Sequence, residues 1–414
     1  KPFFWLADTA WEIFHSLSYE NAELYLKTRS QQGFNVIQTV ILSEFDGLNV
    51  PNHYGRVPLK KNEKGEFDPT LPDTEGDYSF FHHTDKVITL AESYGIYVAL
   101  LPTWGDKYNQ KWGAGPEIFT PDNAFAYGKW LGERYKNNNN IIWVLGGDRP
   151  LEEPVHYEIN EKLALGLKAG GADQLITFHP MGGRSSTEHL HNEDWLDFNM
   201  IQSGHGRAIT INHEMIKADY GLSPVKPVIE AECCYEDHSI SFQPQNGYFD
   251  ATDVRRASYW AVLSGSAGIT YGHHSIWAFK NDPTEDSRFA YPYFIKSWQE
   301  ALTSPCASQM KHLKSLFESV DYQNGVPDNS VLAVNFQGAN HQAVFKGEHF
   351  VFVYCPHGLQ TTLKKDSIHP DCTCKWFDPR TGKSQPAEYC IGDNYVFYPP
   401  SHGRNCDSVL IIEQ

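Results

Sequence analysis

The sequence predicts an α/β protein, a (β/α)8 TIM barrel followed by a small C-terminal all-β sandwich domain. Eight short apolar runs alternate with helix-like segments over the first 319 residues. These runs are continuous rather than alternating, which indicates strands buried on both faces, as in a parallel sheet. Helical periodicity then fades, and short strand-like runs separated by turn residues take over.

The eight predicted strands are residues 2–8, 34–42, 96–104, 141–147, 174–180, 198–203, 227–232 and 268–274. Helical patterns lie between them, for example at 19–32 and at 122–135, where Pro121 marks a helix start. Repeated strand–helix units favour a barrel. A doubly wound sheet is the alternative, but it normally carries a glycine fingerprint after its first strand, and residues 8–11 read DTAW.

The change of pattern predicts two domains, a catalytic barrel at 1–319 and a β-sandwich at 320–414. The C-terminal part contains the runs VLAVNF, QAVFKGEHFVFVYC, TCKWFDPRTGK and SVLIIEQ. Turn signals such as Asp378-Pro379 and Thr381-Gly382 separate them.

Composition and charge narrow the classes of partner. The net charge of −17 repels a polyphosphate, so we expect no nucleic acid partner. No apolar run reaches 18 residues, so we expect no membrane span. Aromatic residues make up 14% of the chain, which is common where sugar rings are bound. The chain contains no signal peptide, but it begins at Lys1 rather than Met, so this says little about export.

Cysteines and histidines show no metal-binding spacing. None of the eight cysteines forms a CxxC or a Cys/His zinc pattern. They fit buried free thiols or, if the protein is exported, one or two disulfides in the C-terminal part. The 19 histidines include no HExxH motif, and histidine also binds sugar hydroxyls. We predict no metal and no cofactor.

Polar and aromatic side chains follow every predicted strand. In a barrel the chemistry lies where the strands end and the βα loops begin. The candidates are Asp8 and Trp11, Glu44, Trp104, Asp148, His179, His205, Glu232 and Tyr235, and finally Tyr271, His273 and Trp277. A pocket lined by acids, imidazoles and indoles, without a phosphate loop, suits neutral polyhydroxyl substrates.

Two of these carboxylates have the positions that glycoside hydrolysis requires. One carboxyl group protonates the leaving oxygen, and the other attacks the anomeric carbon or activates water. Retaining barrel glycosidases commonly place them after strands four and seven, where Asp148 and Glu232 lie. Glu230 faces the same side as Glu232 and is the alternative nucleophile, although Glu232 lies nearer the open end. Arg149 would lower the pKa of Asp148 and oppose proton donation, unless it has another partner.

Several long motifs resemble a known family. DTAWEIF (8–14), GFNVIQTVILSEFDGLNVPNHYG (33–55), ALLPTWGDK (99–107), NIIWVLGGDRP (140–150) and KPVIEAECCYE (226–236) resemble the apiosidase-type glycoside hydrolases, glycoside hydrolase family 140. Relatives are often labelled cellulase or endoglucanase. KWFDPRTGK (375–383) and GRNCDSVLIIE (403–413) resemble the small β-domain that follows the barrel, which is loosely named a collagen-binding domain.

The resemblance implies an exported, exo-acting glycosidase that releases apiose from rhamnogalacturonan-type side chains of plant cell-wall pectin. It implies a catalytic Asp in the GGD motif, here Asp148, and a catalytic Glu after strand seven. Relatives often read Gly-Glu-Pro where this chain reads Ala231-Glu232-Cys233. We therefore predict a retaining exo-glycosidase with Asp148 as acid/base and Glu232 as nucleophile, acting on an oligo- or polysaccharide.

Two other functions stay open. An endo-acting cellulase- or hemicellulase-like enzyme would need an open groove rather than a closed pocket. A non-catalytic carbohydrate-binding protein on a degenerate barrel would not need both carboxylates. The sequence also leaves open the sugar, its linkage, retention or inversion, and the oligomeric state.

Overall fold

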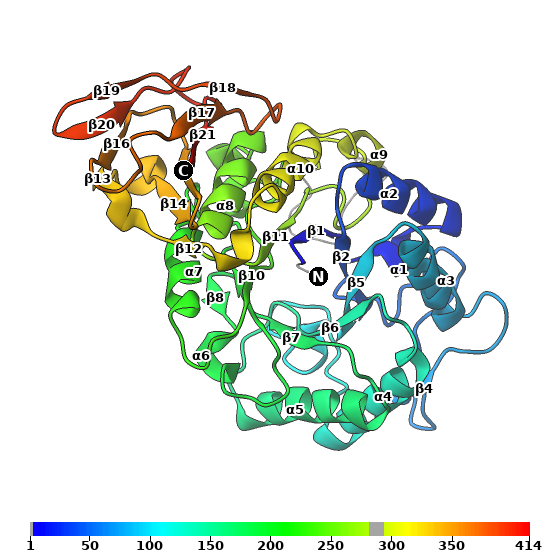
Figure 1. The fold of residues 1–414 in the computed structure, drawn as a ribbon. Helices are drawn as coiled ribbons and strands as arrows, with labels where there is room; N and C mark the ends of the chain where they lie inside the picture. The colour runs from blue at the N-terminus through cyan, green and yellow to red at the C-terminus, as the bar shows by residue number, and fades with distance from the viewer. Residues whose placement is uncertain (1–2, 281–293) are drawn as a thin grey trace. The chain divides into compact units, whose positions relative to one another are not determined.

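The computed structural model describes residues 3–280 and 294–414. Two compact units form (Figure 1). We call Ala7–Gln202 with Gly272–Leu302 the N-terminal unit, and Lys1–Leu6, Ser203–Tyr271 and Thr303–Gln414 the C-terminal unit. The predicted domain boundary between residues 319 and 320 stays a prediction, because the C-terminal unit holds residues from both sides of it.

All eight predicted barrel strands form. They are β1 (Trp5–Thr9), β2 (Val36–Leu42), β5 (Tyr97–Thr103), β6 (Ile141–Gly146), β7 (Ile176–His179), β9 (Asn199–Gln202), β10 (Val228–Glu230) and β11 (Gly268–Tyr271). Every residue in them is buried except Tyr97. The continuous apolar runs therefore do mark strands covered on both faces.

The N-terminal unit is built on five parallel strands in the order β7-β6-β5-β2-β1. The short β8 (Arg184–Ser185) pairs antiparallel with β9. An antiparallel hairpin of β3 (Leu59–Lys61) and β4 (Phe67–Pro72) interrupts the chain after β2, and the sequence patterns did not predict it.

Helices cover the outer side of these five strands (Figure 1). The helices of this unit are α1 (Ile13–Ser16), α2 (Tyr19–Gln31), α3 (Phe80–Ser93), η1 (Gly105–Lys107), α4 (Pro121–Tyr135), α5 (Pro154–Ala169), α6 (Thr187–Leu190) and α9 (Trp298–Ala301). Ser18 caps α2 by accepting the amide of Asn21, and Thr120 caps α4 by accepting that of Asn123. Both predicted helices thus begin within one residue of the expected position.

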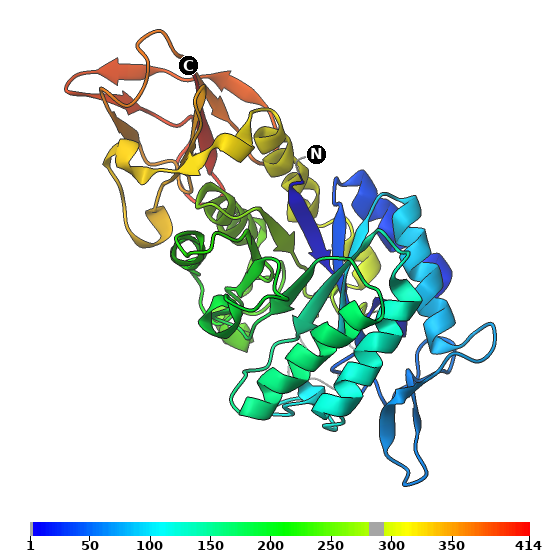
Figure 2. The same cartoon turned by 60° about the horizontal axis from the view of Figure 1, so that its bottom comes forward.

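Helices α4 and α5 lie side by side (Figure 2). Glycines allow their backbones to touch. A Cβ added at Gly128 would lie 2.4 Å from the Leu163 carbonyl oxygen, and one at Gly170 would lie 2.3 Å from that of Lys129. These glycines are required by close packing rather than by backbone conformation.

The C-terminal unit contains the parallel pair β10–β11 and a two-layered β-sandwich. Its helices are α7 (Asn212–Tyr220), η2 (Ile240–Phe242), η3 (Pro244–Asn246), α8 (Ala251–Leu263), α10 (Pro305–Glu318), η4 (Tyr322–Asn324), η5 (Asn329–Val331) and η6 (Gly338–Asn340). One sheet of the sandwich has the order β12-β14-β15-β21-β17-β18 and the other β13-β16-β20-β19. Residues such as Val353, Trp376, Phe397 and Leu410 form the core of the sandwich.

The sandwich has ten strands, of which five lie in the predicted runs and five, at 326–327, 361–364, 384–386, 389–391 and 394–397, lie outside them. They are β12 (Val326–Pro327), β13 (Leu332–Val334), β14 (Ala343–Lys346), β15 (Phe350–Cys355), β16 (Thr361–Lys364), β17 (Thr373–Phe377), β18 (Ser384–Pro386), β19 (Tyr389–Ile391), β20 (Asn394–Phe397) and β21 (Ser408–Glu413). All eight cysteines are free thiols, which was one of the two alternatives; the other was one or two disulfides in the C-terminal part. No helix in the described parts of the chain has the length and apolarity to cross a membrane.

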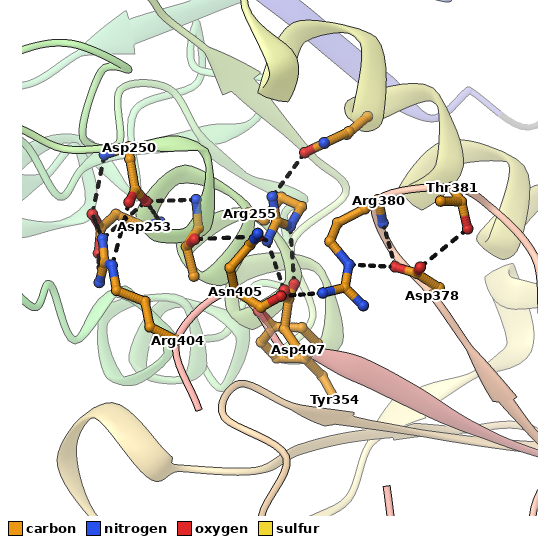
Figure 3. Close-up of polar contacts among 12 residues, drawn as sticks. Asp250, Asp253, Arg255, Tyr354, Asp378, Arg380, Thr381, Arg404, Asn405 and Asp407 are labelled. Carbon is orange, nitrogen blue, oxygen red and sulfur yellow. Dashed lines mark hydrogen bonds and ion pairs between the residues drawn. The ribbon is translucent and has the colours of Figure 1, made fainter. Parts of the chain in front are cut away.

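A buried ion pair joins helix α8 to the segment before β21 (Figure 3). The side chains of Arg255 and Asp407 are both 0% exposed. Arg255 Nη2 donates to Asp407 Oδ1 at 2.6 Å, and Nε donates to Oδ2 at 3.0 Å. Asn405 and Gln309 accept two further guanidinium hydrogens. This two-pronged contact compensates for removing both charges from water.

A second arginine, Arg404, also links the segment before β21 to helix α8 (Figure 3). Arg404 Nη2 lies 2.6 Å from Asp253 Oδ2 and 2.9 Å from Asp250 Oδ1. Asp250 is the N-cap of α8, where its side chain accepts the amides of Thr252 and Asp253. The first turn of α8 is therefore tied to the segment that leads into β21.

Removing the charge of Asp407 should destabilise the protein strongly. In Asp407→Asn the Arg255 guanidinium stays buried without its counter-charge, so the free energy of unfolding should fall by about 3–5 kcal/mol. Urea denaturation of the full chain measures this. The exposed Asp371→Asn is the matched control and should change it by no more than about 0.5 kcal/mol. A loss as small as the control's would mean that the ion pair does not hold α8.

Candidate active site

Asp148 sits on a left-handed turn at the end of β6. The φ angles of Gly146, Gly147 and Asp148 are 92°, 103° and 57°. The turn packs against the end of β5, where the Gly105 amide donates to the Gly147 carbonyl at 3.0 Å. A Cβ at Gly147 would lie 3.0 Å from the Trp104 Cα. An aspartate in this conformation carries local strain, which is typical of functional positions.

Arg149 is the centre of the polar contacts around Asp148. Its side chain is 0% exposed, and Nη1 donates to the Asp148 main-chain oxygen at 2.9 Å. The same Nη1 lies 3.3 Å from Asp148 Oδ2, while Nη2 lies 3.7 Å from Glu44 Oε2. The guanidinium carbon lies 4.5 Å from the centre of the Trp112 ring. Arg149 therefore does have partners other than the Asp148 carboxylate.

Two glycines leave room for this arginine. A Cβ at Gly105 would lie 2.7 Å from the Arg149 Cβ, and one at Gly113 would lie 2.8 Å from Nη2. The second would also lie 2.3 Å from the Asp106 Cβ. The loop after β5 is therefore shaped around the buried guanidinium.

Glu44, which follows β2, differs from an ordinary carboxyl group in its pKa. Burial raises its pKa to about 8, although Arg149 pulls the pKa down. The charge of Asp148 raises it further. Near neutral pH Glu44 thus keeps a proton, and its side chain is 22% exposed.

The predicted aromatic residues of the N-terminal unit form a buried cluster. Trp11 lies edge-on to Trp104 with ring centres 4.9 Å apart, and to His179 at 5.3 Å. Trp277 is half-buried beside Phe45 at 4.9 Å. His273 is fully buried, and its Nδ1 accepts the amide of Ser275 at 3.0 Å, which fixes the ring. The structure thus brings Trp11, Trp104 and His179 together.

Asp8 has a structural role instead of the predicted substrate contact. Its side chain is 0% exposed, and Oδ2 accepts hydrogen bonds from Tyr25 at 2.7 Å and from Arg29 at 2.5 Å. Both partners lie on α2. Side chains alternate along a strand, so Asp8 on β1 points outward to the helix layer.

In the C-terminal unit Glu232 follows β10 and contacts His205. The distance from His205 Nε2 to Glu232 Oε1 is 3.0 Å. His205 Nδ1 accepts the amide of Tyr235 at 3.3 Å, which leaves Nε2 as the nitrogen that donates to the carboxylate. His238 stacks on His205 with ring centres 4.2 Å apart. This geometry orients the Glu232 carboxylate.

Glu230, the alternative nucleophile, is held inside the unit. Its side chain accepts hydrogen bonds from Asn212 Nδ2 at 3.0 Å and the Ser203 amide at 3.2 Å. It is 0% exposed, and burial raises its pKa to about 7. Tyr271 is equally buried and donates to Glu236 Oε2 at 2.8 Å. Glu230 and Tyr271 are therefore both engaged with protein partners.

Sequence reasoning missed two ring side chains, Trp112, which packs on Arg149, and His238, which stacks on His205. Trp112 lies in the polar segment QKWGAG, where a single indole in a glycine-rich loop after a strand was the available signal. Among the described residues no group of three or more His, Cys, Asp or Glu is placed to hold a metal ion.

Solved structures that match this chain define the class of protein. A glycoside hydrolase family 5 protein from Bacteroides vulgatus ATCC 8482 is 30% identical, with a TM-score of 0.89 over 100% of this chain and 90% of that chain. A second structure, named glycoside hydrolase, is 31% identical, with a TM-score of 0.86 over 100% of this chain and 93% of that chain. The protein is a barrel-type glycoside hydrolase, and the predicted (β/α)8 barrel with a β-sandwich is confirmed.

Family models make the assignment more specific. The model "Apiosidase-like, catalytic domain" matches residues 1–324, so the chain belongs to the apiosidase-like family. The model "Putative collagen-binding domain of a collagenase" matches residues 326–413. The endo-1,4-β-D-mannanase of Thermotoga petrophila RKU-1 shares the fold alone, at 13% identity and a TM-score of 0.52 over 76% of this chain and 100% of that chain. No curated protein matches this chain.

The raised pKa of Glu44 makes stability depend on pH. In the unfolded chain this group loses its proton near its ordinary pKa of 4.5, and in the folded protein near pH 8. The folded state therefore binds the proton more tightly, and stability falls as pH rises between these values. Glu44→Gln removes this titration, so its thermal midpoint should fall less than that of wild type from about pH 5 to about pH 8.

Differential scanning calorimetry of both proteins across this pH range measures the effect. The exposed Glu158→Gln is the matched control and should follow wild type at every pH. Equal pH dependence in Glu44→Gln and wild type would show that Glu44 titrates normally.

Proposed function

We propose that this protein is a retaining exo-glycosidase that acts on side chains of plant cell-wall pectin, with apiose as the sugar released. Asp148 is the acid/base and Glu232 the nucleophile. The observation that carries the proposal is the hydrogen bond between His205 and Glu232, since it orients that carboxylate in an otherwise buried position. Membership of the apiosidase-like family supports the choice of sugar.

The proposed reaction has two steps. Glu232 attacks the anomeric carbon while the bond to the leaving oxygen breaks, and Asp148 gives that oxygen a proton. Asp148, now ionised, then takes a proton from a water molecule that attacks the same carbon. This releases Glu232 and restores the proton of Asp148. The sum of both steps consumes one water molecule and retains the anomeric configuration.

Glu44 is the second candidate for the proton donor. Arg149, close to Asp148 Oδ2, favours the ionised form of that carboxyl group and opposes its work as an acid. Glu44 keeps its proton near neutral pH and lies on the other side of the same guanidinium. If Glu44 gives the proton, Asp148 acts as a negative charge that stabilises the oxocarbenium-like transition state.

Two substrates with different leaving groups separate these roles. Asp148→Asn should lose about 10²–10⁴-fold in kcat on a pectin oligosaccharide, whose leaving oxygen needs a proton. It should lose far less on a dinitrophenyl glycoside, whose leaving group needs none. Glu232→Gln should lose both activities, and the exposed Asp173→Asn is the control for Asp148→Asn. If Glu44→Gln, and not Asp148→Asn, loses activity on the oligosaccharide but keeps it on the dinitrophenyl glycoside, Glu44 is the proton donor. If Glu232→Gln stays active, Glu232 is not the nucleophile.

The products distinguish exo from endo action and retention from inversion. An exo-glycosidase acting on an apiose-bearing rhamnogalacturonan II oligosaccharide should release a single monosaccharide from the first minutes onward. Its first-formed anomer, followed by proton NMR before mutarotation, should match the configuration of the bond cleaved. A ladder of shorter oligosaccharides would instead support the endo-acting enzyme.

A further inference from the structure

Trp112 is an exposed indole that packs on Arg149, the residue after the proposed acid. It is 59% exposed, whereas the ten other tryptophans, all within the described residues, are buried or half-buried. Exposing an indole to water leaves roughly 2–3 kcal/mol of burial energy unused, and a ligand that covers the ring recovers it.

Hydrogen bonds hold the loop that carries Trp112. The Gly115 amide donates to Asp106 Oδ2 at 2.8 Å, and the Gln110 amide donates to Glu117 Oε1 at 2.8 Å. Asp106 is itself buried and paired with Lys107 Nζ at 2.7 Å. The loop is thus fixed before any ligand binds, which lowers the entropic cost of binding.

One face of the indole is used within the protein. The Arg149 guanidinium carbon lies 4.5 Å from the ring centre, a cation–π contact that covers that face. Since the residue is nonetheless 59% exposed, the opposite face is open to solvent. A planar apolar face of this kind is what the C–H face of a sugar ring packs against.

A cavity of about 570 Å³ adjoins Trp112. Its lining includes Trp112, Arg149, Phe178, Met181, Arg184 and His189. Cavities of this size hold small ligands. Two lining residues are next in sequence to groups that the acid involves: Arg149 follows Asp148, and Met181 precedes Gly182, whose amide donates to Asp148 Oδ1 at 3.3 Å.

We propose that Trp112 and this cavity form a subsite for the pyranose ring on the leaving-group side of the scissile bond. The inference rests on the proposed function, because a proton donor lies beside the leaving oxygen and Arg149, the residue after Asp148, lines the cavity. Lining cations are partly balanced, with Lys111 2.6 Å from Glu152 and Arg184 3.4 Å from Glu188. The ring face is therefore the common recognition element, whether the sugar is neutral or a uronate.

Binding to a protein that cannot turn over tests this subsite. In the Glu232→Gln background, Trp112→Ala should weaken the binding of pectin-derived oligosaccharides about tenfold, measured by titration calorimetry. Trp112→Phe keeps a ring over Arg149 and should lose less. Tyr78→Ala, which removes another exposed aromatic side chain of the same unit, is the matched control and should bind like the parent. Neutral and uronate-terminated oligosaccharides, tested in parallel, show which ring the subsite takes.

Catalysis provides the second readout. In Trp112→Ala with Glu232 intact, KM for the oligosaccharide should rise about tenfold relative to KM for a glycosyl fluoride, whose leaving group cannot reach the subsite. Parent-like oligosaccharide binding by Trp112→Ala overturns the subsite, whatever the enzyme hydrolyses. Oligosaccharide binding that depends on Trp112, in a protein that hydrolyses none of these sugars, keeps the subsite and overturns the proposed function.

Discussion

The buried guanidinium of Arg149 is the constraint on which the position of Asp148 and the loops around it depends. An ionised arginine that is removed from water needs negative or π-electron partners, and Asp148, Glu44 and Trp112 supply them. Room for the cation explains the glycines of the neighbouring loop. The left-handed turn of Gly146–Asp148 then sets where the carboxylate emerges. The motif GGDR is thus one structural unit, in which the glycines and the arginine together place the aspartate.

Three carboxyl groups at the strand ends have three different environments. Asp148 lies beside a cation, Glu44 is partly buried with its pKa raised to about 8, and Glu232 is hydrogen-bonded to His205. Environments that separate the protonation states of two acids beside one cation, here Asp148 and Glu44, allow one of the two to supply a proton. The assignment of roles therefore follows from what each carboxyl group contacts, more than from its place in the sequence.

Most of the fold was predictable because parallel strands covered on both faces give continuous apolar runs, and all eight barrel strands were found in this way. The hairpin of β3 and β4 was not, since its charged segment KKNEKGEFD carries no hydrophobic period. The prediction for Asp8 failed because alternate side chains of a strand face opposite sides. The sequence does not show which side of β1 faces α2, and the Asp8 side chain lies on that side. Trp112 and His238 lie on loops, whose course depends on contacts distant in sequence.

Covalent trapping tests the central claim, that Glu232 is the nucleophile of a retaining glycosidase, most directly. The wild-type protein would be incubated with a 2-deoxy-2-fluoro glycosyl fluoride of the sugar it releases, and its intact mass and peptide map measured. The account predicts one adduct per chain, located on the peptide that contains Glu232. An adduct on Glu230 or elsewhere, or turnover to an inverted product without any adduct, would contradict it.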